Sequence, residues 1–118
     1  MYSVVILLIV LCSLPVLHAQ EPMFKCKQLT RADGLSNNHI WCALQDRYGF
    51  MWFGSHHGLN RYDGYHITVY PHKPGDTTSL SDITVTCLYE DHEGVLWIGT
   101  LDGGINSFDR ATERFTQY

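Results

Sequence analysis

The sequence predicts an all-β fold built from repeated four-stranded antiparallel sheets, and three observations support this prediction. The pattern of residues 35–54 returns in residues 80–99, after an interval of 45 residues. The apolar runs within each copy are short and rich in aromatic and β-branched residues, as is typical of strands. Turn-forming residues separate these runs, and no segment after residue 20 shows a sustained helical period. A repeat of about 45 residues is characteristic of β-propeller blades, so we expect about two blades in an incomplete ring.

The first blade is expected to occupy residues 35–79. A turn is predicted after its first strand, because the Asp46 carboxylate can accept hydrogen bonds from the backbone and Gly49 can adopt positive φ. Asp63-Gly64 is a two-residue hairpin signal. Residues 71–79 contain two prolines and a glycine and are expected to form a loop. The four predicted strands are residues 40–45, 51–54, 59–62 and 66–70.

The second blade is expected to occupy residues 80–118 and to repeat the first. Asp91 and Gly94 repeat the turn of Asp46 and Gly49, and one extra residue follows before Gly104 matches Gly58. The first two strands of each blade are apolar on both faces, which indicates that each blade packs on a neighbour at either side. The predicted strands are residues 85–90, 95–99, 105–108 and 115–118.

Residues 1–19 are predicted to form a signal peptide that directs export. An unbroken apolar run covers residues 4–11, Pro15 follows, and Ala19 supplies a small residue at the cleavage position. The run is too short to span a bilayer comfortably. No lysine or arginine precedes the run, which departs from the usual pattern. A lipoprotein signal ending at Cys12 and a buried N-terminal strand or helix remain as alternatives.

Residues 20–34 are expected to form an N-terminal closing strand and a loop. The segment 24–29 resembles the strand at 67–70, and a Leu-Ser pair follows it, as in the two blades. Such a strand often completes the last blade of a ring. Because even four blades need roughly 180 residues, we expect the chain to be the N-terminal part of a longer protein.

Composition argues against several kinds of partner. The chain has 12 acidic and 8 basic residues and no basic stripe, so neither nucleic acid nor an anionic membrane is an expected partner. Three cysteines follow the predicted signal peptide, and no Cys-x-x-Cys motif supports a zinc site. Cys42 and Cys87 hold equivalent places on the first strands of the two blades, and we expect both to be reduced and buried.

Two sets of repeated residues are expected to be structural. Trp52 and Trp97 hold matching positions in the second strands, where an indole would bury a large apolar area between blades. Asp46 and Asp91, the latter beside Glu90, could be a pair of carboxylates for acid–base chemistry. Their repetition at a turn favours the structural role instead.

Candidate ligand-binding residues lie in the turns between the second and third strands. His56 and His57 form this turn in the first blade, and Asp102 holds the corresponding turn in the second. Adjacent residues of an extended turn point apart, which argues against a metal site. Solvated surface side chains are the alternative to a ligand-contacting role. No catalytic, cofactor-binding or metal-binding residue is predicted, and the chain itself is not expected to be an enzyme.

The sequence resembles the two-component regulator propeller repeat. The resemblance is carried by residues 34–38, by the Asp46-to-Gly54 segment and by residues 58–64, and residues 90–110 resemble a second unit. It implies the periplasmic sensing part of a hybrid histidine kinase of the Bacteroidetes type, anchored in the inner membrane and acting as a homodimer. It also implies an oligosaccharide ligand and control of polysaccharide use through a phosphorelay, together with further blades and downstream sensor domains.

Two other classes of function remain open. The chain could belong to an exported propeller scaffold for protein interaction, with no small ligand. A propeller-fold lyase or hydrolase is less well supported, because the sequence holds no convergent acid–base or metal set. Propellers host many activities, so the fold alone does not decide among these functions.

Overall fold

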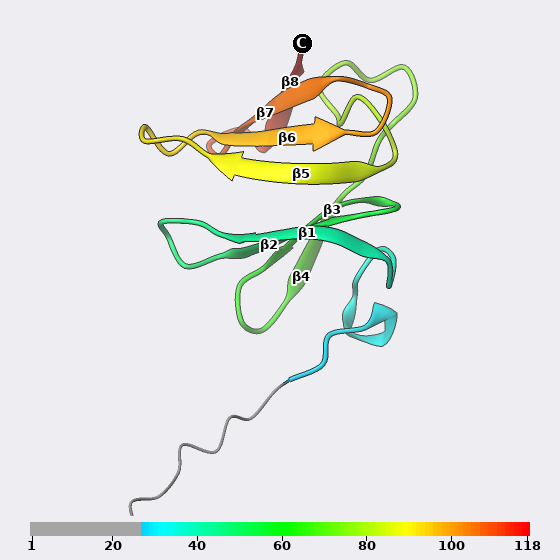
Figure 1. Cartoon of the computed structure of the whole chain (residues 1–118), viewed down its shortest axis with the longest axis vertical. Coiled ribbons are helices and arrows are strands. Elements are labelled where there is room, and N and C mark those ends of the chain that lie inside the picture. The colour runs from blue at the N-terminus through cyan, green and yellow to red at the C-terminus, as the bar shows by residue number, and fades with distance from the viewer. Residues whose placement is uncertain (1–26) are drawn as a thin grey trace, which may run out of the picture.

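The computed structural model describes residues 27–118 and shows two four-stranded antiparallel sheets, each with its strands in chain order (Figure 1). The predicted signal peptide, the alternative signal at Cys12 and the first part of the predicted closing strand lie outside the described residues. Each sheet corresponds to one predicted blade. Every predicted strand is present, with its ends within one residue of those expected. The strands are β1 Ile40–Gln45, β2 Met51–Ser55, β3 Gly58–Tyr62, β4 Ile67–Tyr70, β5 Val85–Glu90, β6 Leu96–Thr100, β7 Ile105–Asp109 and β8 Arg114–Gln117.

The β1–β2 turn is held by an aspartate, as predicted. Asp46 Oδ1 accepts from the backbone N–H groups of Tyr48 (2.9 Å) and Phe50 (3.0 Å). Gly49 has a φ of 90°, a left-handed conformation that favours glycine. Asp91 makes the same pair of bonds in the β5–β6 turn, to Glu93 and Val95 (3.0 and 2.9 Å). These aspartates therefore fix the strand pairs that carry the rest of each blade.

Each blade presents a tryptophan that hydrogen-bonds back to its turn aspartate. Trp52 Nε1 donates to Asp46 Oδ2 (2.8 Å), and Trp97 Nε1 donates to Asp91 Oδ2 (2.9 Å). Trp52 is fully buried between the two sheets and packs on Tyr70 (ring centroids 5.9 Å) and on the edge of Phe108 (5.3 Å). The prediction of an inter-blade core tryptophan is therefore confirmed for Trp52. Trp97 is only partly buried, on the opposite face of blade 2.

Strands β1 and β5 lie side by side, and the two sheets diverge from there toward β4 and β8 (Figure 1). This fan-like arrangement is how successive blades pack in a propeller. The core between the sheets consists of aliphatic and aromatic side chains from both blades and from the connection between them, namely Trp52, Leu59, Tyr70, Leu80, Val85, Leu96, Ile98, Phe108 and Phe115.

Polar contacts tie the two blades together around this core. Arg110, in the β7–β8 turn of blade 2, donates to Asp46 Oδ2 of blade 1 (2.8 Å) and to Glu90 Oε2 (3.0 Å). Tyr70 OH donates to Glu113 Oε1 (2.8 Å), and the carboxylate of Glu113 also pairs with Arg61 (3.3 Å). The Asp46 side chain is fully buried and that of Arg110 is 25% exposed, so their ion pair is partly shielded from solvent.

The stability of the blade pair should depend on pH through Asp46. Burial alone would raise the pKa of this carboxyl, but hydrogen bonds from Trp52, Arg110, Phe50 and Tyr48 outweigh burial and hold it below the ordinary 3.8. A lowered folded-state pKa stabilises the fold above the unfolded-state value, and this contribution is lost as pH falls through the folded-state value.

Urea unfolding of the chain and of Asp46→Asn, measured from about pH 7 to about pH 2.5, tests this dependence. We expect the difference in unfolding free energy between the two to be constant above about pH 5 and to shrink below about pH 4. A difference that stays constant down to the lowest pH would show that Asp46 titrates alike in the folded and unfolded chains.

Two expectations are corrected by the structure. Residues 27–29, the described part of the predicted closing strand, form no strand, and a short 3₁₀ helix at Arg31–Asp33 follows them. A strand needs a neighbour for its ladder, and both described sheets already have four strands in place. Cys42 and Cys87 are both free, as expected, but Cys42 is only half-buried and Cys87 is exposed. Blade 2 packs over the face of blade 1 that carries Cys42, whereas Cys87 lies on the face of blade 2 that no described residue covers.

Candidate functional site

Three loops meet at one edge of the molecule, which we call the histidine edge and define by His39, His56 and His57. The β2–β3 turn lies at this edge with the β6–β7 turn and the β4–β5 connection, on the right in Figure 1. Thr84 Oγ1 donates to the carbonyl of His56 (3.2 Å), and Leu101 N donates to the carbonyl of Thr84 (3.1 Å). These bonds link the turns of the two blades through the connection between them.

A buried asparagine in each blade forms hydrogen bonds to the segment that precedes the first strand, next to this edge. Asn60 Oδ1 accepts from Ser36 N (2.9 Å), and its Nδ2 donates to Ser36 Oγ (2.9 Å). Asn106 makes the same two bonds to Ser81 (3.1 and 2.8 Å). Both asparagines are fully buried, so the segment before each first strand is fixed in the same way in both blades. Sequence analysis did not identify this role, although the two asparagines match in the repeat.

The two predicted histidines, His56 and His57, lie close together at the histidine edge. His57 Nδ1 lies 2.9 Å from Asn37 Nδ2, and His57 N donates to Ser55 Oγ (3.1 Å). The ring of His56 lies 5.4 Å from that of His57 and 6.0 Å from that of His39, measured between centroids. All three imidazoles are exposed. The histidine edge therefore groups three imidazoles where a ligand could reach them.

Trp41 adds an aromatic surface that sequence analysis did not single out. Its indole is 50% exposed and lies 4.9 Å from the ring of His39. Trp41 is the extra residue of a β-bulge, because the pairing of β1 with β2 shifts between Ile40 and Cys42. A bulge re-aims the side chain that it carries. A tryptophan on an apolar strand is usually read as core, so only the position of the bulge could have revealed its exposure.

Asp102, the third predicted site residue, lies in the β6–β7 turn of blade 2. Its backbone N donates to Asp82 Oδ2 (2.9 Å), in a position equivalent to the contact of Asn37 with His57. Within residues 27–118, Asp102 makes no hydrogen bond to His56 or His57. The structure thus brings the two histidines together and places Asp102 in the equivalent turn of the next blade.

The chemistry available at the histidine edge is that of binding. Imidazole and amide groups can donate and accept hydrogen bonds, and an exposed indole can cover an apolar surface of a ligand. No group of three or more His, Cys, Asp or Glu residues among those described is placed to hold a metal ion. The carboxylates of Asp46, Glu90 and Asp91 lie at the opposite edge, where they accept hydrogen bonds from turns, indoles and arginines.

Comparison with known families matches both blades. The two component regulator propeller family matches residues 34–57 and 79–102, which cover the first two strands of each blade and the segments before them. Residues 34–57 and 79–102 are two-component regulator propeller repeats. The all-β fold of propeller blades expected from the sequence is confirmed by this match together with the observed sheets.

Known proteins with such repeats resemble this chain in both sequence and structure. The chain is 40% identical over 65 residues to Histidine kinase P4 of Formosa agariphila, a match that covers 55% of this chain and 5% of that protein. Its structure resembles the extracellular domain assigned to the hybrid two component system BT3049 of B. thetaiotaomicron, with a TM-score of 0.70 and 30% identity. That match covers 78% of this chain and 13% of the other.

A second extracellular domain, assigned to the hybrid two component system BT4673 of B. thetaiotaomicron, has a TM-score of 0.58 and 36% identity. The match covers 69% of this chain and 11% of that domain's chain. The chain therefore spans a small fraction of the length of the proteins that it matches. Within residues 27–118, no helix is long and apolar enough to cross a membrane.

Proposed function

We propose that these two blades are part of the periplasmic ligand-sensing propeller of a hybrid two-component histidine kinase that regulates polysaccharide use. The likeness of both blades to extracellular domains of such sensors carries the proposal. The apolar N-terminal segment agrees with export. In this proposal the whole protein is an inner-membrane homodimer, and the kinase and phosphorelay domains are supplied elsewhere in it.

The ligand that best fits the histidine edge is an oligosaccharide. Sugars offer many hydroxyl groups and apolar patches of C–H groups, and they are recognised by a few placed polar side chains beside an aromatic surface. Trp41 supplies the aromatic surface, and the Asn37–His57 pair supplies polar groups beside it.

Isothermal titration of the chain with oligosaccharides from partial hydrolysis of plant, algal and host polysaccharides tests this function. For an oligosaccharide that binds, Trp41→Ala should weaken the affinity by about tenfold or more, because aromatic anchors carry much of a binding energy. His57→Ala should weaken it by about threefold to tenfold through loss of a hydrogen bond.

Tyr65→Ala is the matched control. Tyr65 is 87% exposed in the β3–β4 turn, which lies at the edge opposite the histidines. Its replacement should therefore leave the affinity unchanged. An oligosaccharide that binds equally well to the chain and to Trp41→Ala would exclude the histidine edge as its site. Failure of the whole panel to bind would count against carbohydrate sensing by these blades.

A further inference from the structure

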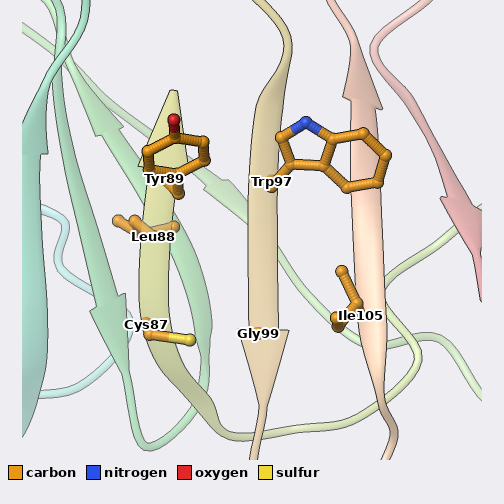
Figure 2. A pocket seen from close by; sticks show the side chains of 6 residues that line it. All are labelled: Cys87, Leu88, Tyr89, Trp97, Gly99 and Ile105. Carbon is orange, nitrogen blue, oxygen red and sulfur yellow. The ribbon is translucent and has the colours of Figure 1, made fainter. Parts of the chain in front are cut away.

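One face of blade 2 is apolar and uncovered by any described residue. Figure 2 shows Tyr89 beside Trp97 on β5 and β6 and, farther along the same strands, Cys87 beside Gly99, with Ile105 next to Gly99 on β7. The rings of Trp97 and Tyr118 lie 5.6 Å apart at their centroids and extend the apolar surface toward β8. We call this surface the open face and define it by Cys87, Tyr89, Trp97, Ile105 and Tyr118.

The equivalent face of blade 1 is covered, and blade 2 covers it. Tyr70 is 8% exposed, whereas its equivalent Tyr118 is 69% exposed. Leu59 is fully buried, whereas its equivalent Ile105 is 53% exposed. The same positions therefore form an interface in one blade and a free surface in the other. Because the two blades are copies of one repeat, the packing of blade 2 on blade 1 shows what kind of surface fits the open face.

The hydrogen bonds of Asp91 show which polar group is missing. Asp46 and Asp91 each accept from two backbone N–H groups of their turn and from the indole of their tryptophan. Asp46 Oδ2 has one further partner, Arg110 Nη1 of the following blade at 2.8 Å. The carboxylate of Asp91 has no arginine partner among residues 27–118, although Arg47 Nη2 donates to the Asp91 backbone carbonyl (2.9 Å). The set of bonds at Asp91 thus matches that at Asp46 except for this one ion pair.

We propose that the open face docks a further propeller blade that brings an arginine from the turn between its third and fourth strands to Asp91. Continuity with the interface between the two blades supports this partner, as does the negative charge left beside Trp97. The proposal goes beyond ligand sensing, since it concerns how the blade array is continued and which blade fits.

A second copy of this chain fits the open face less well. Its blade 1 would have to pack there, and blade 1 carries Gly64 at the position that Arg110 holds in blade 2. The hairpins also differ in register, because Tyr62 pairs with Ile67 in blade 1, whereas its equivalent Phe108 pairs with Phe115 in blade 2. A second copy would therefore cover the apolar residues but bring no guanidinium to Asp91.

The test extends the full chain after Tyr118 with a second copy of residues 71–118, in which the appended Cys87 is replaced by serine. The appended blade carries its own Arg110 and can pack on the open face as blade 2 packs on blade 1. The original Cys87 then reports coverage through its rate of alkylation by iodoacetamide, followed by peptide mass spectrometry at low protein concentration. Cys42 provides the rate for the half-buried cysteine at the equivalent position of blade 1.

We expect the extension to slow alkylation of Cys87 about tenfold or more, toward the rate of Cys42, because a packed interface must open before the thiol reacts. Arg110→Ala in the appended copy alone should restore at least about a third of the lost reactivity, through loss of the ion pair to Asp91. The matched Arg114→Ala in the appended copy, at an exposed residue of the same turn region, should leave the protection intact.

Three results would overturn the proposal. First, Cys87 could be alkylated at the same rate with and without the extension. This result counts against the proposal both when the appended blade resists protease and when it is cleaved. The appended Arg110→Ala could protect as well as the unmodified extension, which would remove the arginine from the recognition. Protection of Cys87 in the unextended chain that grows with protein concentration would identify a second copy as the occupant.

Discussion

Replacing Asp46 with alanine is expected to lower the free energy of unfolding by about 2–4 kcal/mol, because the change leaves the buried indole N–H and two turn N–H groups without their acceptor and removes one of the two carboxylate partners of Arg110. Asp46 accepts from two backbone N–H groups, from the indole of Trp52 and from Arg110 of the other blade. One side chain therefore closes a turn, orients the main core aromatic and joins the blades. Urea unfolding followed by far-ultraviolet circular dichroism measures the loss.

Asp91→Ala is the matched control for this prediction. It removes the same turn and indole hydrogen bonds but no ion pair between blades, and the residue is more exposed. We expect a loss of about 1–2 kcal/mol, as for a turn cap and an indole bond in partial contact with solvent. Equal losses for Asp46→Ala and Asp91→Ala would show that Arg110 adds nothing to the stability of the blade pair.

Replacing Trp52 with alanine should have a similarly large effect, about 3–5 kcal/mol, because a fully buried indole leaves a cavity that the core cannot refill. Its ring contacts Tyr70 and Phe108, which belong to different blades. The loss should therefore uncouple the blades as well as weaken blade 1. Hydrogen exchange of β2 and β6 amides, measured together with urea unfolding, reports both effects.

Trp97→Ala provides the comparison at the equivalent position of blade 2. Its indole is partly exposed on the open face, so we expect a loss of about 1 kcal/mol from the smaller buried area. A loss at Trp97 as large as that at Trp52 would contradict the structure, since it would require Trp97 to be covered in the isolated chain.

Much of the fold could be predicted from the sequence because its signals are local. The turn of Asp46 and Gly49 is determined by neighbouring residues, and its repetition as Asp91 and Gly94 fixes the period of the blades. The buried role of Trp52 also follows from the repeat. The exposure of Cys87 does not, because burial depends on which blade packs over a given face.

The contacts between the two blades could not be predicted from local sequence patterns. Arg110 bonds to Asp46 from 64 residues away, and no local pattern shows that pairing. At the candidate site, the turn histidines could be predicted from the alignment of the two blades. Trp41 could not, because a bulge turns it outward from a strand that otherwise alternates into the core.

Amide chemical-shift mapping shows whether the proposed oligosaccharide ligand binds at the histidine edge. The ¹⁵N-labelled chain is titrated with the oligosaccharide that binds in calorimetry. We expect shifts at the backbone amides of the histidine edge and none at the turn of Tyr65. The shifted amides should be those of Asn37, His39, Trp41, His56 and His57. Shifts centred on the β1–β2 and β5–β6 turns, or no shifts with any oligosaccharide of the panel, would contradict it.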